Sequence, residues 1–239
     1  MGRKKNPEQT IEQIIAVSSQ LFVEKGYEQT SIQDILDALD LSKGGLYHHF
    51  KSKEEILEAV MHKRAQYVID RLYTIIQNTE AENAKEKLKK ILYQLGTDSK
   101  THELDSVLTS QMINPYFVVD GLQASMKQDA PIISRLIEEG IKDGSLQTTQ
   151  PTYCAEVFLI LLNYWANPAL FGRNHLETKE RMKYLQFVTK QLGLDIIDDE
   201  QFLITSFDSK LFVIFFICMT FFSYSLHMKP TSGLYCGKK

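Results

Sequence analysis

The chain has 239 residues, of which 44% are hydrophobic and 24% are charged, and its formal net charge is −3. This composition excludes disordered, collagen-like and disulfide-scaffold proteins, which need far fewer apolar residues, a periodic glycine or dense cysteine. The near-neutral balance also excludes a histone-like polycation. Any contact with nucleic acid must therefore come from a local cluster of basic groups.

The cysteines indicate the cellular compartment. Cys154, Cys218 and Cys236 lie far apart and form no C-x-x-C motif, so neither a zinc knuckle nor a redox pair is indicated. An odd number of widely spaced cysteines suits a reducing cytosol. The first residues lack the continuous apolar stretch of a secretory signal, and the sequence therefore predicts a cytoplasmic protein.

Two helix signals follow each other at the start of the chain. Asn6 can cap a helix that begins at Pro7 and stops at Gly26, because glycine adopts the left-handed conformation most readily. Four residues later, Thr30 and Gln33 have the spacing of a capping box and predict a second, short helix.

Two further start signals come before residue 60. Ser42 predicts a third helix over residues 43–49, and Ser52 opens a long fourth helix that runs to about Gln77. No sustained alternation of apolar and polar residues indicates a strand, so the fold class is predicted as all-α. Beyond Asn78 the periodicity predicts longer, more apolar helices, roughly over residues 83–95, 104–113, 117–127, 131–142, 152–167 and 178–192.

The second and third helices, joined by a tight turn, have the layout of a helix-turn-helix. Lys43 at a helix start can reach a phosphate or the acceptor edge of guanine, while Gly44 and Gly45 let the backbone approach the floor of a DNA groove. The hydroxyl and N–H groups at the start of the second helix are suited to an anion. The predicted DNA-binding residues are Thr30, Ser31, Ser42, Lys43, Gly44, Gly45, Tyr47, His48, His49 and Lys53.

These residues stand in a known pattern. The chain has Leu21-Phe-x-x-x-Gly26-Tyr27, then Thr30-Ser31-Ile32-x-x-Ile35, then Leu41-Ser42-Lys-Gly44-x-Leu46-Tyr47-x-His49-Phe50-x-Ser52-Lys53-x-x-Ile56. Over about residues 8–58 it resembles the DNA-binding domain of TetR-type (tetracycline-repressor-like) transcriptional regulators. The resemblance implies an all-helical homodimer that reads a pseudo-palindromic double-stranded DNA operator. It also implies a C-terminal cavity in which a small-molecule effector binds and releases the DNA.

The pattern departs from the family at two places. Leu39-Asp40 stands where the family usually has Ala-Gly in the turn; aspartate tolerates the left-handed conformation better than most residues, so the turn is expected to survive. Gly45 stands where a phosphate-binding threonine or serine is common. It removes one hydroxyl contact and weakens the third helix by up to about 1 kcal/mol relative to alanine.

These signals divide the chain into three parts: a helix-turn-helix DNA-binding domain over residues 1–52, a helical effector-binding and dimerisation domain over 53–195, and a hydrophobic extension over 196–239. The helices over 152–167 and 178–192 are expected to form a four-helix bundle with those of a second copy. A ligand pocket is the functional interpretation, and ordinary core packing the alternative, for Met112, Tyr116, Phe117, Phe158, Leu162 and Trp165.

The C-terminal extension carries an uncharged stretch from Leu211 to Leu226. Its sixteen residues fall short of the roughly 20 that span a bilayer, although Lys210 and Lys229 could reach the interface at its ends. Three explanations stay open: a marginal membrane anchor, an additional helix that covers the dimer, and a non-native extension.

The sequence thus predicts a ligand-responsive, dimeric transcriptional regulator, in the first place a repressor, with no catalytic residue, metal site or cofactor. Catalysis has little support because the histidines lack a cysteine or serine partner at a recognisable spacing, and no Gly-rich phosphate loop or H-E-x-x-H motif occurs. The alternative is a helical dimeric interaction module with weakened DNA binding that binds a partner, either a protein or, through its tail, a membrane.

Overall fold

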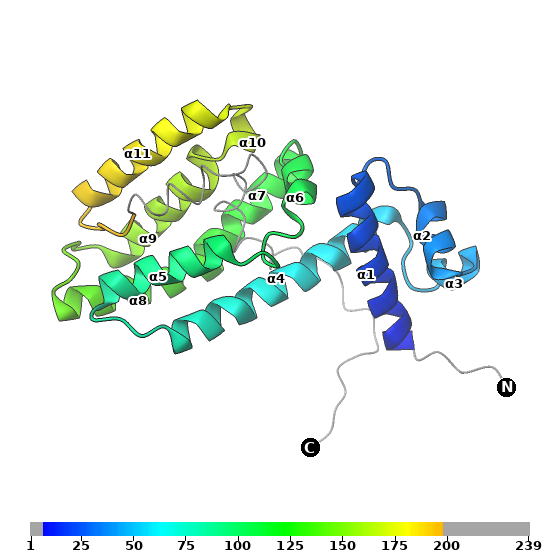
Figure 1. Ribbon diagram of the computed structural model, residues 1–239, viewed down its shortest axis with the longest axis horizontal. Helices are drawn as coiled ribbons and strands as arrows, with labels where there is room; N and C mark the ends of the chain where they lie inside the picture. Colours follow the sequence, from blue (N-terminus) through cyan, green and yellow to red (C-terminus); the bar gives the residue numbers. More distant parts are fainter. Residues whose placement is uncertain (1–6, 198–239) are drawn as a thin grey trace, which may run out of the picture.

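The computed structural model describes residues 7–197, and every regular element within that range is a helix (Figure 1). The all-α prediction is therefore confirmed. The predicted cap Asn6 lies outside the described residues.

The first two helices end as their sequence predicts. α1 (Pro7–Lys25) stops where Gly26 adopts a φ of 87°, in the left-handed region that glycine occupies without strain. α2 (Ile32–Leu39) stops at Asp40, whose φ of 50° and ψ of 45° are also left-handed. The prediction that an aspartate keeps this turn is confirmed.

The cap of α2 is Ser31 and not Thr30, so the predicted cap is wrong by one residue. The Ser31 hydroxyl accepts a hydrogen bond from the Asp34 N–H, and the Asp34 carboxylate accepts one from the Ser31 N–H at 2.8 Å. This reciprocal pair is the capping box that the spacing had assigned to Thr30 and Gln33.

The next two helices begin at their predicted caps. Ser42 caps α3 (Lys43–Tyr47), which ends two residues earlier than predicted, before His48. Ser52 caps α4 (Lys53–Asn78), which ends within one residue of the predicted boundary.

Two of the later elements, η1 and η2, are single π-helical turns, which were not predicted. η1 joins α7 to α8 where a break was expected; Pro131 falls at the start of α8, a position at which a missing N–H is tolerated. η2 continues α9 within the apolar helix predicted over residues 152–167. The elements are α5 (Ala84–Thr97), α6 (Asp105–Gln111), α7 (Pro115–Ala124), η1 (Ser125–Asp129), α8 (Ala130–Asp143), α9 (Pro151–Ile160), η2 (Leu161–Trp165), α10 (Pro168–Phe171) and α11 (His175–Gln191).

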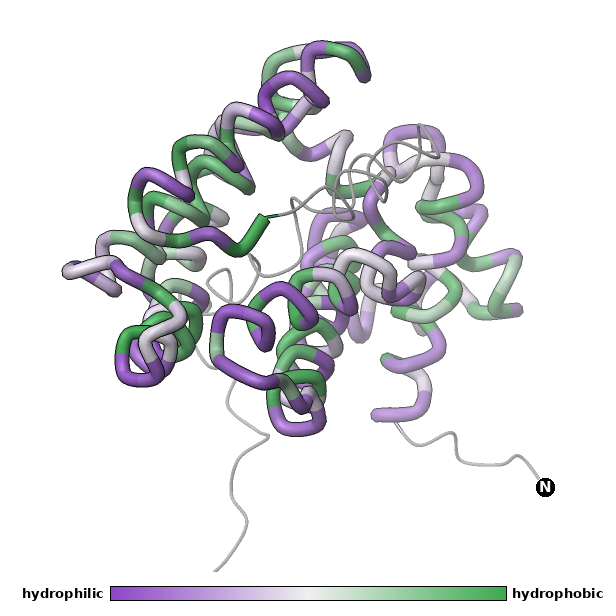
Figure 2. The backbone as a smooth tube through the Cα atoms, turned by 60° about the vertical axis from the view of Figure 1, so that its left-hand side comes forward, coloured by the Kyte–Doolittle hydropathy of each residue, from purple (hydrophilic) through white to green (hydrophobic). Residues whose placement is uncertain are grey.

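α4 connects two groups of helices. Figure 1 shows α1, α2 and α3 at one end of the molecule, α5 to α11 at the other, and α4 running between them. α4 packs against α1 and against α5, while α8 packs against α5 and α9. Hydrophobic and hydrophilic positions alternate along the helices (Figure 2), and the buried apolar side chains form one continuous core from Ile14 to Ile197.

The core extends past the predicted end of the second domain. Ile196 and Ile197 are buried in it, and the Gln186 side chain donates a hydrogen bond to the Ile197 carbonyl oxygen at 3.1 Å. The uncharged stretch from Leu211 to Leu226 lies outside the described residues. Within residues 7–197, no helix combines the length and the apolar character that a membrane crossing requires.

Candidate DNA interface

α3 has a buried side and an exposed side. Leu46 is fully buried in the core (0% exposed), whereas Tyr47 is 42% exposed, and Lys43, Gly44 and His48 are exposed with it. Lys43 and Tyr47 are four residues apart and share a face, so that Lys43 Nζ lies 5.9 Å from the centre of the Tyr47 ring. α3 and the residue that follows it therefore present a cation, a phenol and an imidazole to solvent, groups that donate hydrogen bonds to phosphates and base edges.

The histidine pair follows α3 directly. His48 is exposed and His49 is half-buried, and their ring centres lie 5.1 Å apart with the planes inclined at 69°. The two rings therefore point in different directions, and His48 is the more accessible donor.

The N-terminus of α2 already holds an anionic group. The Asp34 carboxylate accepts hydrogen bonds from Lys25 Nζ at 2.6 Å, from the Ser31 hydroxyl at 2.6 Å and from the Ser31 N–H at 2.8 Å. These bonds, with that from Lys25 the strongest influence, hold the pKa of Asp34 well below its usual range. The carboxylate occupies the position at which a phosphate was expected, and the Ser31 hydroxyl is engaged within the chain.

Thr30 is buried instead of offering a hydroxyl to solvent. It is 1% exposed, and its hydroxyl donates to the carbonyl oxygen of Gly26 at 2.8 Å, with the Leu21 carbonyl oxygen 3.2 Å away. The prediction of an exposed Thr30 hydroxyl is wrong because α2 starts one residue later. Thr30 holds the turn after α1 in place.

Lys53 ties the start of α4 to the same turn. Its Nζ donates to the carbonyl oxygens of Tyr27 at 2.9 Å and Thr30 at 3.0 Å, and it lies 4.3 Å from the centre of the Tyr27 ring. The predicted phosphate-binding ammonium thus has partners within the chain. Lys53 positions the helix-turn-helix relative to α4.

Lys53→Met is expected to lower the free energy of unfolding by about 1–2 kcal/mol, because a charged donor to three backbone carbonyl oxygens is lost at a half-buried site. Chemical denaturation followed by circular dichroism measures this change. Lys51→Met, at an exposed position, is the matched control and is expected to stay within about 0.5 kcal/mol of wild type. Unchanged stability of Lys53→Met with weakened DNA binding would instead support a phosphate contact.

Tyr27 and Asp34 organise the site but were missed from the sequence. Ser31 and Asp34 have the same three-residue separation as Thr30 and Gln33, so spacing alone fits both pairs. The acidic residue in the first turn was the available signal for the correct pair, because a negative charge is favoured there. The ring of Tyr27 offered no comparable signal, since its partner lies 26 residues further along the chain.

The two glycines of α3 differ in the space beside them. A Cβ on Gly44 would meet no atom within 4 Å, whereas one on Gly45 would lie 3.3 Å from Ser42 Oγ. Gly44→Ala is therefore expected to stabilise the protein by up to about 1 kcal/mol. It is also expected to weaken DNA binding, because the added methyl group faces the groove. Thermal denaturation and DNA titration of this one variant measure both effects, and undiminished DNA affinity would contradict the predicted close approach.

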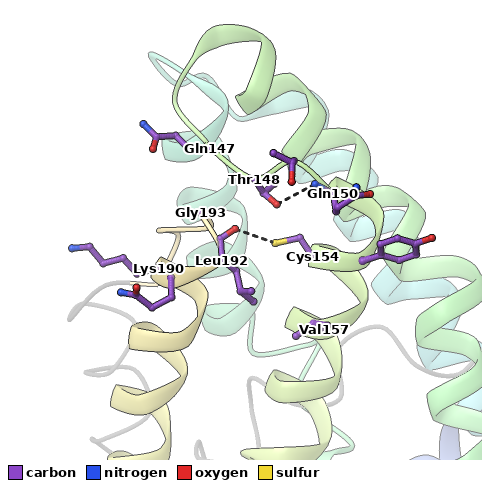
Figure 3. Close-up of a pocket in the computed structure, with 11 residues that line it drawn as sticks. Gln147, Thr148, Gln150, Cys154, Val157, Lys190, Leu192 and Gly193 are labelled. Carbon is purple, nitrogen blue, oxygen red and sulfur yellow. Dashed lines mark hydrogen bonds between the residues drawn. The ribbon is translucent and has the colours of Figure 1, made fainter.

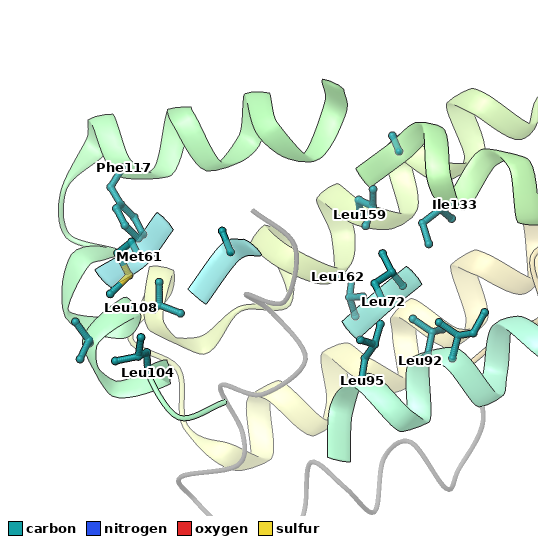
Figure 4. Packing of buried hydrophobic residues seen from close by; sticks show 14 of the residues in the cluster. Met61, Leu72, Leu92, Leu95, Leu104, Leu108, Phe117, Ile133, Leu159 and Leu162 are labelled. Atoms are coloured by element: carbon teal, nitrogen blue, oxygen red, sulfur yellow. The ribbon is translucent and has the colours of Figure 1, made fainter. Parts of the chain in front are cut away.

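Three of the predicted effector residues are core residues. Phe158 and Leu162 are buried, and Phe117 packs with Met61 and Leu108 (Figure 4). Their burial fits either the wall of a closed pocket or plain packing, so their role as ligand contacts stays a prediction.

The other three differ in exposure. Met112 packs against the core, and Trp165 is half-buried with Arg181 4.8 Å from its ring centre and Tyr184 6.1 Å from it. Tyr116 is 79% exposed at the start of α7. The expectation that Tyr116 lines an enclosed pocket is therefore wrong for this conformation.

A cleft of about 500 Å³ opens between the start of α9 and the end of α11 (Figure 3). The Cys154 thiol lies in it and donates to the Leu192 carbonyl oxygen at 4.0 Å, and burial raises the pKa of this thiol. None of the predicted effector residues lines this cleft. Its lining is Gln147, Thr148, Thr149, Gln150, Tyr153, Cys154, Val157, Lys190, Gln191, Leu192 and Gly193.

Exposed apolar side chains line up on α9 and α11. Tyr153, Val157 and Ile160 stand four and three residues apart on α9, and Tyr184 and Phe187 stand three apart on α11. This spacing places each set on one face of its helix. These are the helices predicted to pair with a second copy.

Comparisons with known proteins agree with the helix-turn-helix. Residues 14–60 match the family described as "Bacterial regulatory proteins, tetR family". The HTH-type transcriptional repressor KstR2 of Mycolicibacterium smegmatis is 25% identical over 140 residues, which are 57% of this chain and 67% of that protein. The Transposon Tn10 TetC protein of Escherichia coli is 26% identical over 181 residues, 75% of this chain and 88% of that protein.

A solved structure shares the fold over most of the chain. The crystal structure of a transcriptional regulator from Cytophaga hutchinsonii superposes with a TM-score of 0.60 at 18% sequence identity, covering 77% of this chain and 96% of that one. Together with the helix-turn-helix formed by α2 and α3, these likenesses identify the chain as a member of the TetR family of DNA-binding transcriptional regulators.

Proposed function

We propose that this regulator is a repressor that binds a pseudo-palindromic operator as a homodimer and leaves it when a small-molecule effector binds. The two-sided α3, which buries Leu46 and exposes Lys43 and Tyr47, is the observation that carries the proposal. Repression is favoured because KstR2 is named a transcriptional repressor.

The DNA contacts are assigned to the exposed side of α3 and its two ends. Lys43 and Tyr47 reach phosphates and base edges, and Gly44 lets the backbone come close to the groove. Thr30 and Lys53 hold the helix-turn-helix in shape, and Ser31, whose N–H and hydroxyl both donate to Asp34, caps the start of α2. The assigned contact residues are Ser42, Lys43, Gly44, Gly45, Tyr47, His48 and His49.

Dimerisation through α9 and α11 makes up for the small number of cations on one α3. The exposed apolar rows on these helices meet those of a second copy in a four-helix bundle. Two copies double the contacts and require half-sites about 34–36 Å apart, or a multiple of that spacing.

Effector binding is assigned to the helices after α4. Phe117, Phe158, Leu162 and Trp165 supply the apolar wall, with Met112 at its edge. Tyr116 is left out of this wall because of its exposure.

Selection from a random duplex library tests the proposal, with purified protein at two salt concentrations and the dimer checked by sedimentation velocity. An enriched pseudo-palindrome whose binding weakens steeply with salt is the expected result, since neutralised phosphates release counterions. A folded dimer that enriches no sequence would refute the DNA-binding assignment. It would support the interaction module as the alternative function.

A further inference from the structure

Two single π-helical turns lie close together in the effector half. η1 sits between α7 and α8, η2 continues α9, and η1 contacts α9. A π-turn inserts one extra residue into a helix and reorients the side chains around it, and such turns occur frequently at functional sites. Two neighbouring π-turns therefore mark a region whose side chains are held in unusual directions.

η1 buries two polar side chains that stand four residues apart. Ser125 is 0% exposed and Asp129 is 3% exposed. Within the part of the chain that the structure describes, neither Ser125 Oγ nor Asp129 Oδ2 makes a hydrogen bond of ordinary distance and angle, although the Ser125 hydroxyl is near enough to lower the pKa of Asp129. Buried polar atoms in native proteins are nearly always hydrogen-bonded. Two buried oxygen atoms without such bonds, four residues apart, therefore indicate a site for a bound molecule that supplies hydrogen-bond donors.

Tyr164 of η2 completes this group, which we name the π-turn cluster: Ser125, Asp129 and Tyr164. Burial raises the pKa of Tyr164 to about 12; the nearby Ser125 hydroxyl lowers it in part, and the charge of Asp129 raises it. The phenol therefore lies beside both groups of η1. Tyr164 is half-buried, so one member of the cluster is partly exposed to solvent.

The π-turn cluster contains a carboxyl group but no cationic side chain. Burial raises the pKa of Asp129 well above its usual range, and the Ser125 hydroxyl offsets this only in part. Among residues 7–197, Asp129 takes part in no ion pair. A carboxylate becomes stable at such a site when a cation comes within reach and further hydrogen bonds satisfy the pair.

We propose that the π-turn cluster is the polar anchor of the effector site and that the effector is a mainly apolar molecule with a protonated primary amine. The three N–H donors of a primary ammonium match the three oxygen acceptors of Asp129, Ser125 and Tyr164. The apolar body of the ligand would contact apolar surroundings, since Ala124, Ala130 and Leu162 next to the cluster are buried. The role in gene regulation rests on the proposed function, but the binding itself is measured without DNA.

The chain provides its own reporter for this site. Trp165 is the single tryptophan of the 239 residues, and it directly follows Tyr164 in η2. A ligand that reaches the π-turn cluster is therefore expected to change the tryptophan fluorescence of the full-length protein.

The experiment titrates 4-phenylbutylamine and 4-phenylbutan-1-ol, together with their shorter and longer homologues, while tryptophan fluorescence is recorded. These probes differ in the ammonium group and share the apolar body. The wild type is expected to bind the amine at least tenfold more tightly than the alcohol. Asp129→Asn keeps the side-chain size, removes the charge, and is expected to cost at least tenfold in amine affinity and less than twofold in alcohol affinity. Asp120→Asn, on α7, is the matched control and is expected to bind both as wild type does.

Equal amine affinity in wild type and Asp129→Asn would overturn the inference. The absence of binding by every amine of the series would also overturn it and would leave the cluster as a site for water only. Circular dichroism confirms that the variants are folded. Tyr164→Phe, which removes one acceptor, gives a second test if Asp129→Asn does not fold, with a several-fold loss of amine affinity expected. Duplex selection on the same preparation separates this inference from the proposed function, because DNA binding without amine binding refutes only the inference.

Discussion

Tyr47→Ala is expected to weaken operator binding by at least about tenfold per half-site, with the free energy of unfolding within about 0.5 kcal/mol of wild type. Tyr47 is exposed on the side of α3 that faces away from the core, so its ring contributes little to packing. A contact with a base edge or phosphate at this position is worth about 1–3 kcal/mol. Titration with the selected operator duplex at fixed salt measures the loss.

Leu46→Ala is the matched comparison one residue earlier. Leu46 is fully buried, so its truncation is expected to lower the free energy of unfolding by about 2–5 kcal/mol. The two neighbours thus separate the stability of α3 from its contact with DNA. Wild-type operator affinity in a dimeric Tyr47→Ala would show that the DNA face lies elsewhere.

Asp105→Asn is expected to lower the free energy of unfolding by about 3 kcal/mol or more. The Asp105 carboxylate lies between Arg64 Nη2 of α4 at 3.5 Å and His102 Nδ1 at 3.0 Å, and all three side chains are almost fully buried. Removing one partner of a buried ion pair leaves the other charge uncompensated, which costs about 3–5 kcal/mol.

Urea denaturation of Asp105→Asn against wild type measures this loss. Asp70→Asn changes the same chemical group at an exposed position of α4 and is expected to stay within about 0.5 kcal/mol of wild type. Similar small losses in both variants would mean that the buried network around Asp105 does not link α4 to α6.

Sequence patterns predicted the structure well wherever one residue's own chemistry decides the backbone. Gly26 ends α1, and Asp40 adopts the left-handed conformation that its short polar side chain permits. Ser42 and Ser52 cap the helices assigned to them. The order and extent of the first four helices follow from such local signals.

Features that depend on neighbours in space could not be predicted in this way. Lys53 binds carbonyl oxygens 23 and 26 residues earlier in the chain, so no local pattern reveals its partners. The π-turns η1 and η2 have no sequence signature, because one inserted residue leaves the apolar pattern of a helix nearly unchanged. The residues predicted to line a ligand pocket, such as Phe158, have the same apolar pattern as the core in which they are buried.

α4 has a mechanical consequence for this fold. Its 26 residues include neither glycine nor proline and, at 1.5 Å per residue, make a rod about 39 Å long. A tilt of about 5° at the end held by α5 would sweep the other end through about 3 Å, the length of a hydrogen bond. The long helix therefore amplifies a small angular change among α5 to α11. In the proposed dimer, a tilt too slight to disturb the core would be enough to carry the two α3 helices out of step with the turn of a DNA duplex.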